Sequence, residues 1–169
     1  FQNYKRSKNW NNTTDRWWLM LHVKIIDIEK DKIKTSIAEA FIKSSSYGAS
    51  IIFNGTVRNI NENKEVIGMT YDTHDELVIK SFEEIYNEAS EKLKIIDKAV
   101  FIEHIKGYVG LGETSIIVAV ACKHRDQAYM LSRYIIEEIK KRSPIWKKEH
   151  YKNEQSEWLK GNPIQNEKI

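Results

Sequence analysis

A cluster of basic residues around a proline is the part of this sequence whose residue types could do chemistry. Lys140 precedes Pro144 by four residues and Lys147 follows it by three, within the segment KKRSPIWKKE at 140–149. Proline cannot donate a backbone hydrogen bond and disfavours helical geometry in the residue before it, so a helix is expected to end here. Two ammonium groups held at such a corner would form an anion site. The alternative is a solvated basic helix end, where cations complement the helix dipole.

Three further cations follow predicted strands elsewhere in the chain. Arg58 ends the strand that contains Gly55, and His124 and Arg125 follow the apolar strand around Val120. If these strand ends lie at the same sheet edge as the end of the last helix, five cations converge around the proline corner. Such a pocket would bind phosphate or carboxylate, since arginine presents a planar fork of donors and lysine a compact charge. A lysine crowded by other cations has a lowered pKa and can carry protons or act as a nucleophile. Each of these residues taken alone is also typical of an ordinary surface cation.

The spacing of apolar residues predicts the elements that would position these side chains. Helical periodicity predicts three amphipathic helices, over about 33–41, 76–94 and 126–140, the last with an apolar face of Ala128, Leu131, Ile135 and Ile139. Apolar β-rich runs predict strands over 19–28, 49–57, 66–72, 99–105 and 113–122, with a hairpin connection at 59–64 and a glycine-rich loop at 106–113. Paired strands alternating with helices predict an α+β fold, with helices packed on one antiparallel or mixed sheet.

Two expectations concern the parts of the chain around these elements. The length of 169 residues suits one domain, assigned to residues 21–169, with residues 1–20 as a loosely docked N-terminal extension. At the proline corner, Trp146 is expected to be an apolar anchor that fixes where Lys147 points.

Composition excludes several classes of protein. The 27 Lys+Arg against 24 Asp+Glu leave a net charge of +3, a small excess that argues against a dedicated nucleic-acid binder. The longest apolar run, Ser115 to Cys122, is far too short to span a bilayer, and the polar, basic start does not resemble a signal peptide. The lone Cys122 cannot form an internal disulfide and suits a buried thiol in a reducing compartment. We therefore expect a cytoplasmic (cytosolic) protein with no nucleic-acid or membrane partner.

The remaining motifs do not predict a metal or nucleotide site. The five histidines show no paired metal-ligand spacing, and one cysteine cannot form a thiolate cluster. The glycines at 107–112 lack the Gly-Lys-Ser/Thr of a phosphate loop and the spacing of the dinucleotide motif, so turn formation is favoured. The expectation is therefore no metal and no resident cofactor.

Taken together, several of these segments resemble the large subunit of molybdopterin synthase. The resemblance is carried by FNGTVRN at 53–59, by His124-Arg125, and by SPIWKKE at 143–149 with Lys140 upstream. Weaker similarities are Met69-Thr70-Tyr71, His104 with Gly107, Gly112-Glu113, and Trp158 to Asn162. The similar region extends from about Ile25 to Asn162, which is most of the chain.

The resemblance implies an α/β hammerhead-type fold and a homodimer in which each large subunit binds a small ubiquitin-like sulfur carrier. In that family the carrier's C-terminal thiocarboxylate supplies two sulfurs that convert cyclic pyranopterin monophosphate (precursor Z) to molybdopterin, in molybdenum cofactor biosynthesis. By the same resemblance, Lys140 and Lys147 are catalytic. The implied substrate-binding residues are Thr56, Val57, Arg58, His124, Arg125, Lys140, Lys147, Lys148 and Glu149.

The sequence also departs from the family pattern. Ile105 stands where the family commonly has an arginine, and the family's Tyr-Glu-x-Tyr segment reads Tyr71-Asp72-Thr73-His74. The competing hypotheses are an RNA- or anion-binding module that uses the basic patch without catalysis, and a catalytically idle scaffold. The mechanistic hypothesis is that Arg58, His124 and Arg125 hold the pterin phosphate while Lys140 and Lys147 contact the thiocarboxylate and shuttle protons.

Overall fold

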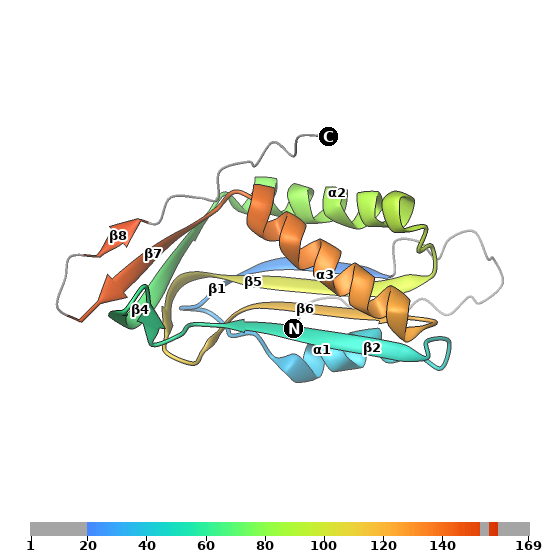
Figure 1. The fold of residues 1–169 in the computed structure, drawn as a ribbon, viewed down its shortest axis with the longest axis horizontal. Helices are drawn as coiled ribbons and strands as arrows, with labels where there is room; N and C mark the ends of the chain where they lie inside the picture. The colour runs from blue at the N-terminus through green and yellow to red at the C-terminus, as the bar shows by residue number, and fades with distance from the viewer. Residues whose placement is uncertain (1–19, 153–155, 159–169) are drawn as a thin grey trace.

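The computed structural model describes residues 20–152 and 156–158, so the predictions for residues 1–19 lie outside the described residues (Figure 1). Three helices and eight strands form the described part. The helices are α1 (Thr35–Ile42), α2 (Asp75–Leu93) and α3 (Arg125–Arg142). The strands are β1 (Leu21–Asp27), β2 (Ala49–Thr56), β3 (Ile60–Asn61), β4 (Lys64–Thr73), β5 (Lys98–Gly110), β6 (Thr114–Cys122), β7 (Ile145–Tyr151) and β8 (Glu157–Trp158).

One mixed sheet organises the fold, and β5 is shared by its two parts. The strand order is β2-β6-β5-β4-β7-β8, with β1 parallel to β5 and all other pairs antiparallel. The first part of β5 pairs with β1 and β6, and its last residues, 107–110, pair with β4. We call β1, β2, β6, the first part of β5 and the three helices the main lobe, and β4, β7, β8 and the end of β5 the arm. Figure 1 shows the arm extending beyond the helix-covered sheet.

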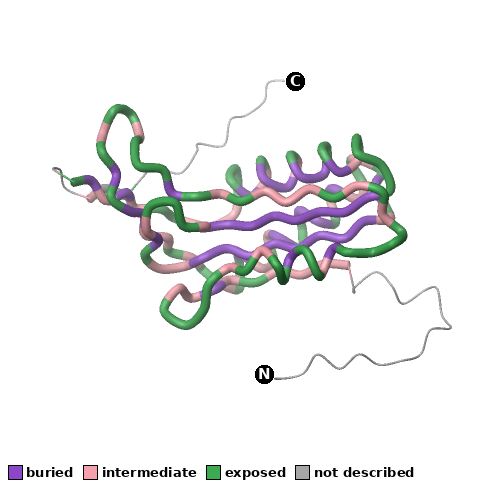
Figure 2. The backbone as a smooth tube through the Cα atoms, turned by 90° about the horizontal axis from the view of Figure 1, so that it is seen from below, coloured by how far each residue is buried: buried purple, intermediate pink, exposed green. Residues whose placement is uncertain are grey.

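Helices cover both faces of the main lobe, which explains why apolar residues of its central strands β5 and β6 are buried on both faces. On one face, α2 and α3 pack against alternate residues of β5 and β6, including Val100, Ile102 and Val118. On the other face, α1 packs against the residues between them, such as Phe101 and Ala119. Figure 2 shows the resulting continuous burial along the central strands. The expected α+β class with a mixed sheet is confirmed.

Most of the predicted elements are confirmed, although α1 presents a partly different face from the one expected. α3 buries Ala128, Leu131, Ile135 and Ile139 as predicted. α1 begins at Thr35 and buries Ala38 and Ile42, whereas Ile37 is 48% exposed. The sequence pattern assigned Ile33, Ile37, Phe41 and Ala38 to the apolar face. Ala38 is buried and Phe41 packs partly buried against the core, but Ile33 precedes the helix and packs from the connection. The connection at 59–64 is a hairpin whose two central residues have positive φ, as tight hairpins require.

The predicted loop at 106–113 is wrong for most of its length. β5 continues to Gly110, and only the following residues form the turn into β6. Gly107 has a φ of +103°, which a side-chain-bearing residue rarely adopts, and it lies where β5 exchanges β1 and β6 for β4 as partners. Gly107 therefore allows β5 to pass from the main lobe into the arm, and it does not form part of a loop.

Three strands were not predicted: the two-residue β3, which lies within the predicted hairpin connection, and β7 and β8. β7 begins directly after the proline corner and pairs along most of β4, and the short β8 pairs with β7. The sequence of β7 contains three charged residues in a row, Lys147 to Glu149, so it lacks the apolar alternation by which a strand is recognised. Its strand conformation comes from pairing with β4.

Candidate active site at the proline corner

The end of α3 places Lys140 in solvent on its last turn. The N–H of Ser143 donates to the carbonyl of Ile139 at 3.1 Å, which caps the helix, and Pro144 follows before β7 begins at Ile145. Ile139 is buried in the main core and Lys140 is exposed. The predicted helix end at the proline is confirmed, and the buried neighbour fixes the backbone of Lys140.

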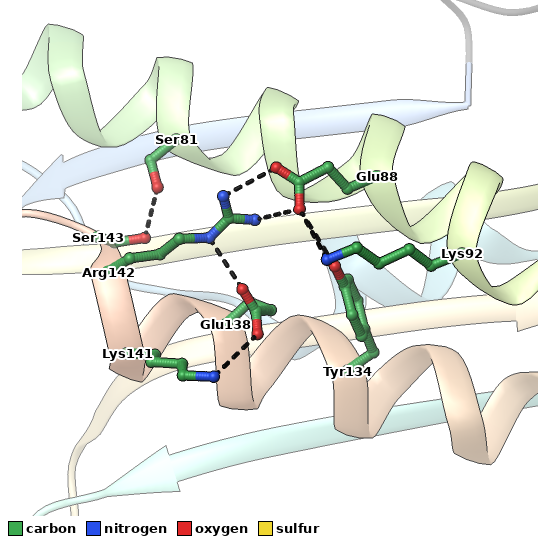
Figure 3. Close-up of polar contacts among 8 residues, drawn as sticks. All are labelled: Ser81, Glu88, Lys92, Tyr134, Glu138, Lys141, Arg142 and Ser143. Carbon is green, nitrogen blue, oxygen red and sulfur yellow. Dashed lines mark hydrogen bonds and ion pairs between the residues drawn. The ribbon is translucent and has the colours of Figure 1, made fainter. Parts of the chain in front are cut away.

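An ion-pair network anchors this end of α3 to α2 (Figure 3). Arg142 donates through both terminal nitrogens to the carboxylate of Glu88, at 2.8 and 2.9 Å, and its Nε lies 3.0 Å from Glu138. The hydroxyls of Ser81 and Ser143 are 2.8 Å apart. The hydrogen bond to Glu88 raises the pKa of Arg142 and the same bond lowers the pKa of Glu88. A bidentate pair of this kind fixes orientation as well as distance, so α2 sets the position of the corner.

Lys147 is positioned by the β4–β7 ladder. Tyr71 is its cross-strand partner, and partners across an antiparallel pair project from the same face of the sheet. Trp146 is 50% exposed, so the expectation that it anchors Lys147 is wrong. Backbone pairing with β4 fixes the position of Lys147 instead, because Lys147 lies within a continuous strand rather than in a loop after the corner.

The segment Thr56 to Arg58 lies at the end of β2 and is held by the turn between β5 and β6. The N–H of Val57 donates to the carbonyl of Glu113 at 3.2 Å, and its carbonyl accepts from Gly112 at 2.8 Å. The Val57 side chain is 4% exposed and belongs to the core beneath the arm. Thr56 and Arg58, on either side, are exposed. Val57 therefore holds the segment while its neighbours present side chains to solvent.

A chain of polar contacts links the end of β2 to Tyr71, the cross-strand partner of Lys147. The hydroxyl of Ser115 donates to the carbonyl of Gly55 at 3.1 Å. Burial raises the pKa of Tyr71, and a hydrogen bond to Ser115 partly offsets this shift. Tyr71 is therefore connected to the end of β2 through Ser115 and to β7 through its pairing with Lys147.

Lys148 and Glu149 point to opposite faces of the arm, as alternation along a strand requires. The Lys148 ammonium lies 5.9 Å from the centre of the Trp158 ring, on the face away from Lys147. Glu149 is on the same face as Lys147 but is only 5% exposed. Of these two predicted substrate-binding residues, only Glu149 shares a face with Lys147, and it is buried.

His124 and Arg125 lie at the far end of the main lobe from the proline corner. Arg125 opens α3 and Lys140 lies on its last turn, so at about 1.5 Å per residue their backbones are about 22 Å apart. Arg58 is also distant from them, because β2 and β6 are antiparallel and Ala49, not Thr56, pairs with Cys122. The expectation that five cations converge in one pocket is wrong within a single chain. The structure places Lys140 and Lys147 on the two sides of the proline corner, at the end of α3 and in β7, and separates His124 and Arg125 from Lys140.

Tyr71 and His104 are two site residues to which sequence reasoning assigned no role. Their rings meet edge to face, with centroids 5.0 Å apart. His104 is buried, and its Nδ1 donates to the carbonyl of Ile105 at 2.7 Å, which leaves Nε2 as an acceptor. Burial lowers the pKa of His104 to about 4, so the imidazole is neutral at neutral pH. The alternation of Met69 and Tyr71 in β4 could have indicated from the sequence that Tyr71 points inward. Its contact with His104 could not be predicted, because it depends on how the strands pair in the sheet.

The arrangement is suited to holding an anion and transferring protons. Arg58 offers a planar fork, and Lys140 and Lys147 offer ammonium donors on either side of a rigid corner. Within residues 20–152 and 156–158, no three His, Cys, Asp or Glu side chains gather as metal ligands would. In the same described ranges, none of the helices is long and apolar enough to cross a membrane.

Comparison with known proteins identifies the family. The family model described as MoaE protein matches residues 28–142. The molybdopterin synthase catalytic subunit of Pyrococcus abyssi is 39% identical over 124 residues, covering 73% of this chain and 82% of the relative. That of Synechococcus elongatus is 36% identical, covering 81% of this chain and 82% of the relative.

Solved structures show the same relationship. The crystal structure of molybdopterin synthase from Staphylococcus aureus superimposes with a TM-score of 0.72 at 27% identity, covering 82% of this chain and 96% of that one. A Helicobacter pylori structure has a TM-score of 0.65 at 24% identity, which shows the shared fold. From the matched family model and these relatives, the chain belongs to the MoaE protein family.

Proposed function

We propose that this chain is the catalytic large subunit of a molybdopterin synthase, a sulfurtransferase of molybdenum cofactor biosynthesis. It would convert cyclic pyranopterin monophosphate to molybdopterin with two sulfurs, one from the thiocarboxylated end of each of two small carrier subunits, which are left as carboxylates. The observation that carries this proposal is the proline corner, where Lys140 and Lys147 lie on the two sides of a rigid helix–strand junction. The relatives named molybdopterin synthase catalytic subunit support it.

The geometry suggests separate roles for the three cations. Arg58 is exposed and suited to hold the phosphate of the pterin through a bidentate contact. Lys140 and Lys147 would bind the carrier's thiocarboxylate and carry protons to and from the reacting centre as sulfur is transferred. A positioned proton carrier contributes typically a hundredfold to ten-thousandfold in rate. Thr56 is exposed next to Arg58 and would make a secondary contact, whereas Lys148 lies on the opposite face of β7 from Lys147.

The position of His124 and Arg125 supports a homodimer. Both are exposed at the start of α3, about 22 Å from Lys140 by helix rise. If they act on the same substrate as Lys140 and Lys147, a second copy of the chain must supply them. We propose a homodimer in which the start of α3 of one subunit approaches the proline corner of the other.

The carrier is the second partner in this proposal. The Helicobacter pylori neighbour is described as a protein–protein complex of subunits 1 and 2 of molybdopterin-converting factor. One carrier on each subunit of a homodimer would give a heterotetramer. The enzyme would need no metal or resident cofactor, and a cytosolic location suits the soluble substrate and the single buried Cys122.

Reconstitution tests the proposed activity. The purified chain is mixed with thiocarboxylated carrier and cyclic pyranopterin monophosphate, and the product is oxidised to its fluorescent pterin. The expected result is carrier-dependent product, with none from unmodified carrier. A folded chain that yields no product but binds RNA, with affinity that falls steeply with salt, would instead support the anion-binding alternative.

A mixed-dimer experiment tests the shared site. A chain with Arg125→Ala is combined with a chain with Lys140→Ala, each inactive as a homodimer under the proposal. Mixed dimers would regain about half of the activity of the wild-type dimer, because one of their two sites has all of its residues. Absence of recovery in a preparation shown to contain mixed dimers would contradict the shared site.

A further inference from the structure

A buried carboxylate joins the β3–β4 hairpin to β7. One oxygen of Glu149, Oε2, accepts hydrogen bonds from Asn61 Nδ2 at 2.9 Å and from the Tyr151 hydroxyl at 2.6 Å. Glu149 is 5% exposed and Tyr151 is 9% exposed. Among the described residues, every fully buried side-chain nitrogen or oxygen has a hydrogen-bond partner, so this carboxylate is satisfied in place.

The two donors come from segments that carry different site residues. Asn61 is in β3, three residues after Arg58, and the hairpin is closed by Val66 N–H donating to the Asn59 carbonyl at 2.9 Å. Glu149 is two residues after Lys147 on the same face of β7. The Asn61–Glu149 bond is thus a direct side-chain link between the segment that carries Arg58 and the strand that carries Lys147.

The burial of Glu149 argues against direct contact with substrate. Two donors already occupy Oε2, and the hydrogen bond to Glu149 is the largest cause of the raised pKa of Tyr151, which keeps the phenol protonated as a donor. A carboxylate beside an incoming phosphate would also repel it. A role in holding the hairpin fits the burial of Glu149, its two hydrogen-bond donors and its negative charge.

We propose that Asn61 and Tyr151 are positioning residues that act through Glu149 to set the separation between Arg58 and Lys147. This inference rests on the proposed function, because it assigns Arg58 to the substrate phosphate and Lys147 to sulfur transfer. Loss of the Asn61 bond frees the hairpin, so Arg58 holds the phosphate less well while Lys147 stays in its ladder with β4.

The kinetic test uses Asn61→Ala and Tyr151→Phe in the carrier-loaded enzyme. For Asn61→Ala the expected result is a KM for cyclic pyranopterin monophosphate raised about tenfold, the equivalent of one lost hydrogen bond, with kcat within about twofold of wild type. Tyr151→Phe is also expected to raise KM. In the double variant the fold-increase in KM should be smaller than the product of the two single increases, because both hydrogen bonds meet at one oxygen. An unchanged KM in folded Asn61→Ala, or a fall in kcat alone, would overturn the inference.

Two matched variants control for general damage. Asn63→Gly alters the same hairpin at a position with a φ of +64°, which glycine adopts readily. Tyr108→Phe removes a hydroxyl that donates to the Ile67 carbonyl at 2.9 Å, outside the Glu149 contacts. Both are expected to keep the wild-type KM, and a rise equal to that of Asn61→Ala would refute a specific role for Glu149.

A readout that needs no activity separates this inference from the proposed function. The Val66 amide closes the hairpin by donating to Asn59, and the Val57 amide just before it donates to Glu113 in the turn between β5 and β6. Hydrogen exchange at both amides is expected to accelerate in Asn61→Ala while the amides of α3 keep their rates. If the wild type makes no molybdopterin but exchange accelerates, the proposed function fails and the positioning contact stands. If exchange at the hairpin is unchanged, the positioning contact fails whatever the activity.

Discussion

The main lobe and the arm illustrate two ways in which a chain positions lysines. In the main lobe, Lys98 is 1% exposed, and its ammonium donates to Ser90 and to the carbonyl of Ile95 at 3.0 Å and lies 4.2 Å from the Tyr86 ring centre. At the junction with the arm, Lys140 and Lys147 are exposed. A buried lysine with all its donors engaged stabilises local structure, whereas an exposed lysine on a rigid backbone is available to a ligand.

The largest expected effect is on activity at the junction. Lys140→Ala and Lys147→Ala should each lower turnover by about a hundredfold to ten-thousandfold, because a positioned proton carrier is lost. Lys141→Ala, which changes the neighbouring cation, should keep turnover within a few-fold. Single-turnover formation of the fluorescent pterin measures both, and circular dichroism checks folding. Near-normal turnover in folded Lys140→Ala would remove Lys140 from its catalytic role.

The largest effect on stability is expected in the main lobe. Phe82 is fully buried between α2 and the sheet, so Phe82→Ala should lower the free energy of unfolding by about 3–5 kcal/mol through lost burial and a cavity. Trp146→Ala in the arm should cost about 1–2 kcal/mol, since half of that side chain is already in solvent. Urea unfolding measures both, and equal losses would contradict the contrast between main lobe and arm.

An effect of intermediate size is expected on how the free energy of unfolding depends on pH, through the ionisation of Lys98. Burial lowers its pKa to about 8, whereas an unfolded lysine keeps a pKa near 10.4. Between these values the unfolded chain binds more protons, so this residue's contribution to stability rises with pH, by up to about 3 kcal/mol in total. Burial raises the pKa of the neighbouring Cys122 to about 11, which acts in the opposite direction. The informative quantity is therefore the difference between wild type and Lys98→Met.

The Lys98 comparison is made by urea unfolding at about pH 7 and pH 9.5. Wild type should gain stability relative to Lys98→Met as the pH rises. Lys123→Met is the matched control, because Lys123 is exposed and lies 3.2 Å from Asp97 at the same end of the sheet. A difference that is constant with pH would show that Lys98 keeps an ordinary pKa in the folded protein.

The smallest effect is expected at the link between α2 and α3. The side chains of Glu88 and Arg142 are each about one-third exposed, at 34% and 31%, so solvent screening weakens the pair. Glu88→Gln should cost roughly 1 kcal/mol of stability, less in high salt, and should lower turnover severalfold as the end of α3 loosens. Unfolding at low and high salt, together with turnover, checks both parts. A stability loss with unchanged turnover would show that Pro144 and Ile139 suffice to hold Lys140.

The main lobe was largely predictable because local patterns report burial. The apolar face of α3 and the apolar runs of β5 and β6 reflect packing that repeats with the period of the element. The arm was less predictable. β7 carries Lys147, Lys148 and Glu149 in succession, and only its pairing with β4 makes that segment a strand.

The candidate site shows the same division. Residue types and spacing identified Lys140, Lys147 and Arg58, because the proline corner and the family motifs are contiguous in the chain. The same reasoning grouped His124 and Arg125 with them and assigned Glu149 to substrate. The antiparallel register of β2 and β6 and the length of α3 place His124 and Arg125 far from the proline corner. Glu149 is buried and hydrogen-bonded to Asn61 and Tyr151, which argues against its contact with substrate.

What the sequence determined by itself was local: the stop of α3 at Pro144, the buried strands, and the cations of the proline corner. The tertiary structure alone decided which distant residues meet, including Tyr71 with Lys147 and Asn61 with Glu149. The physical reason is that a helix end or an apolar face depends on neighbours within a few residues. A contact across the sheet depends instead on strand register, which is set by the packing of the whole fold.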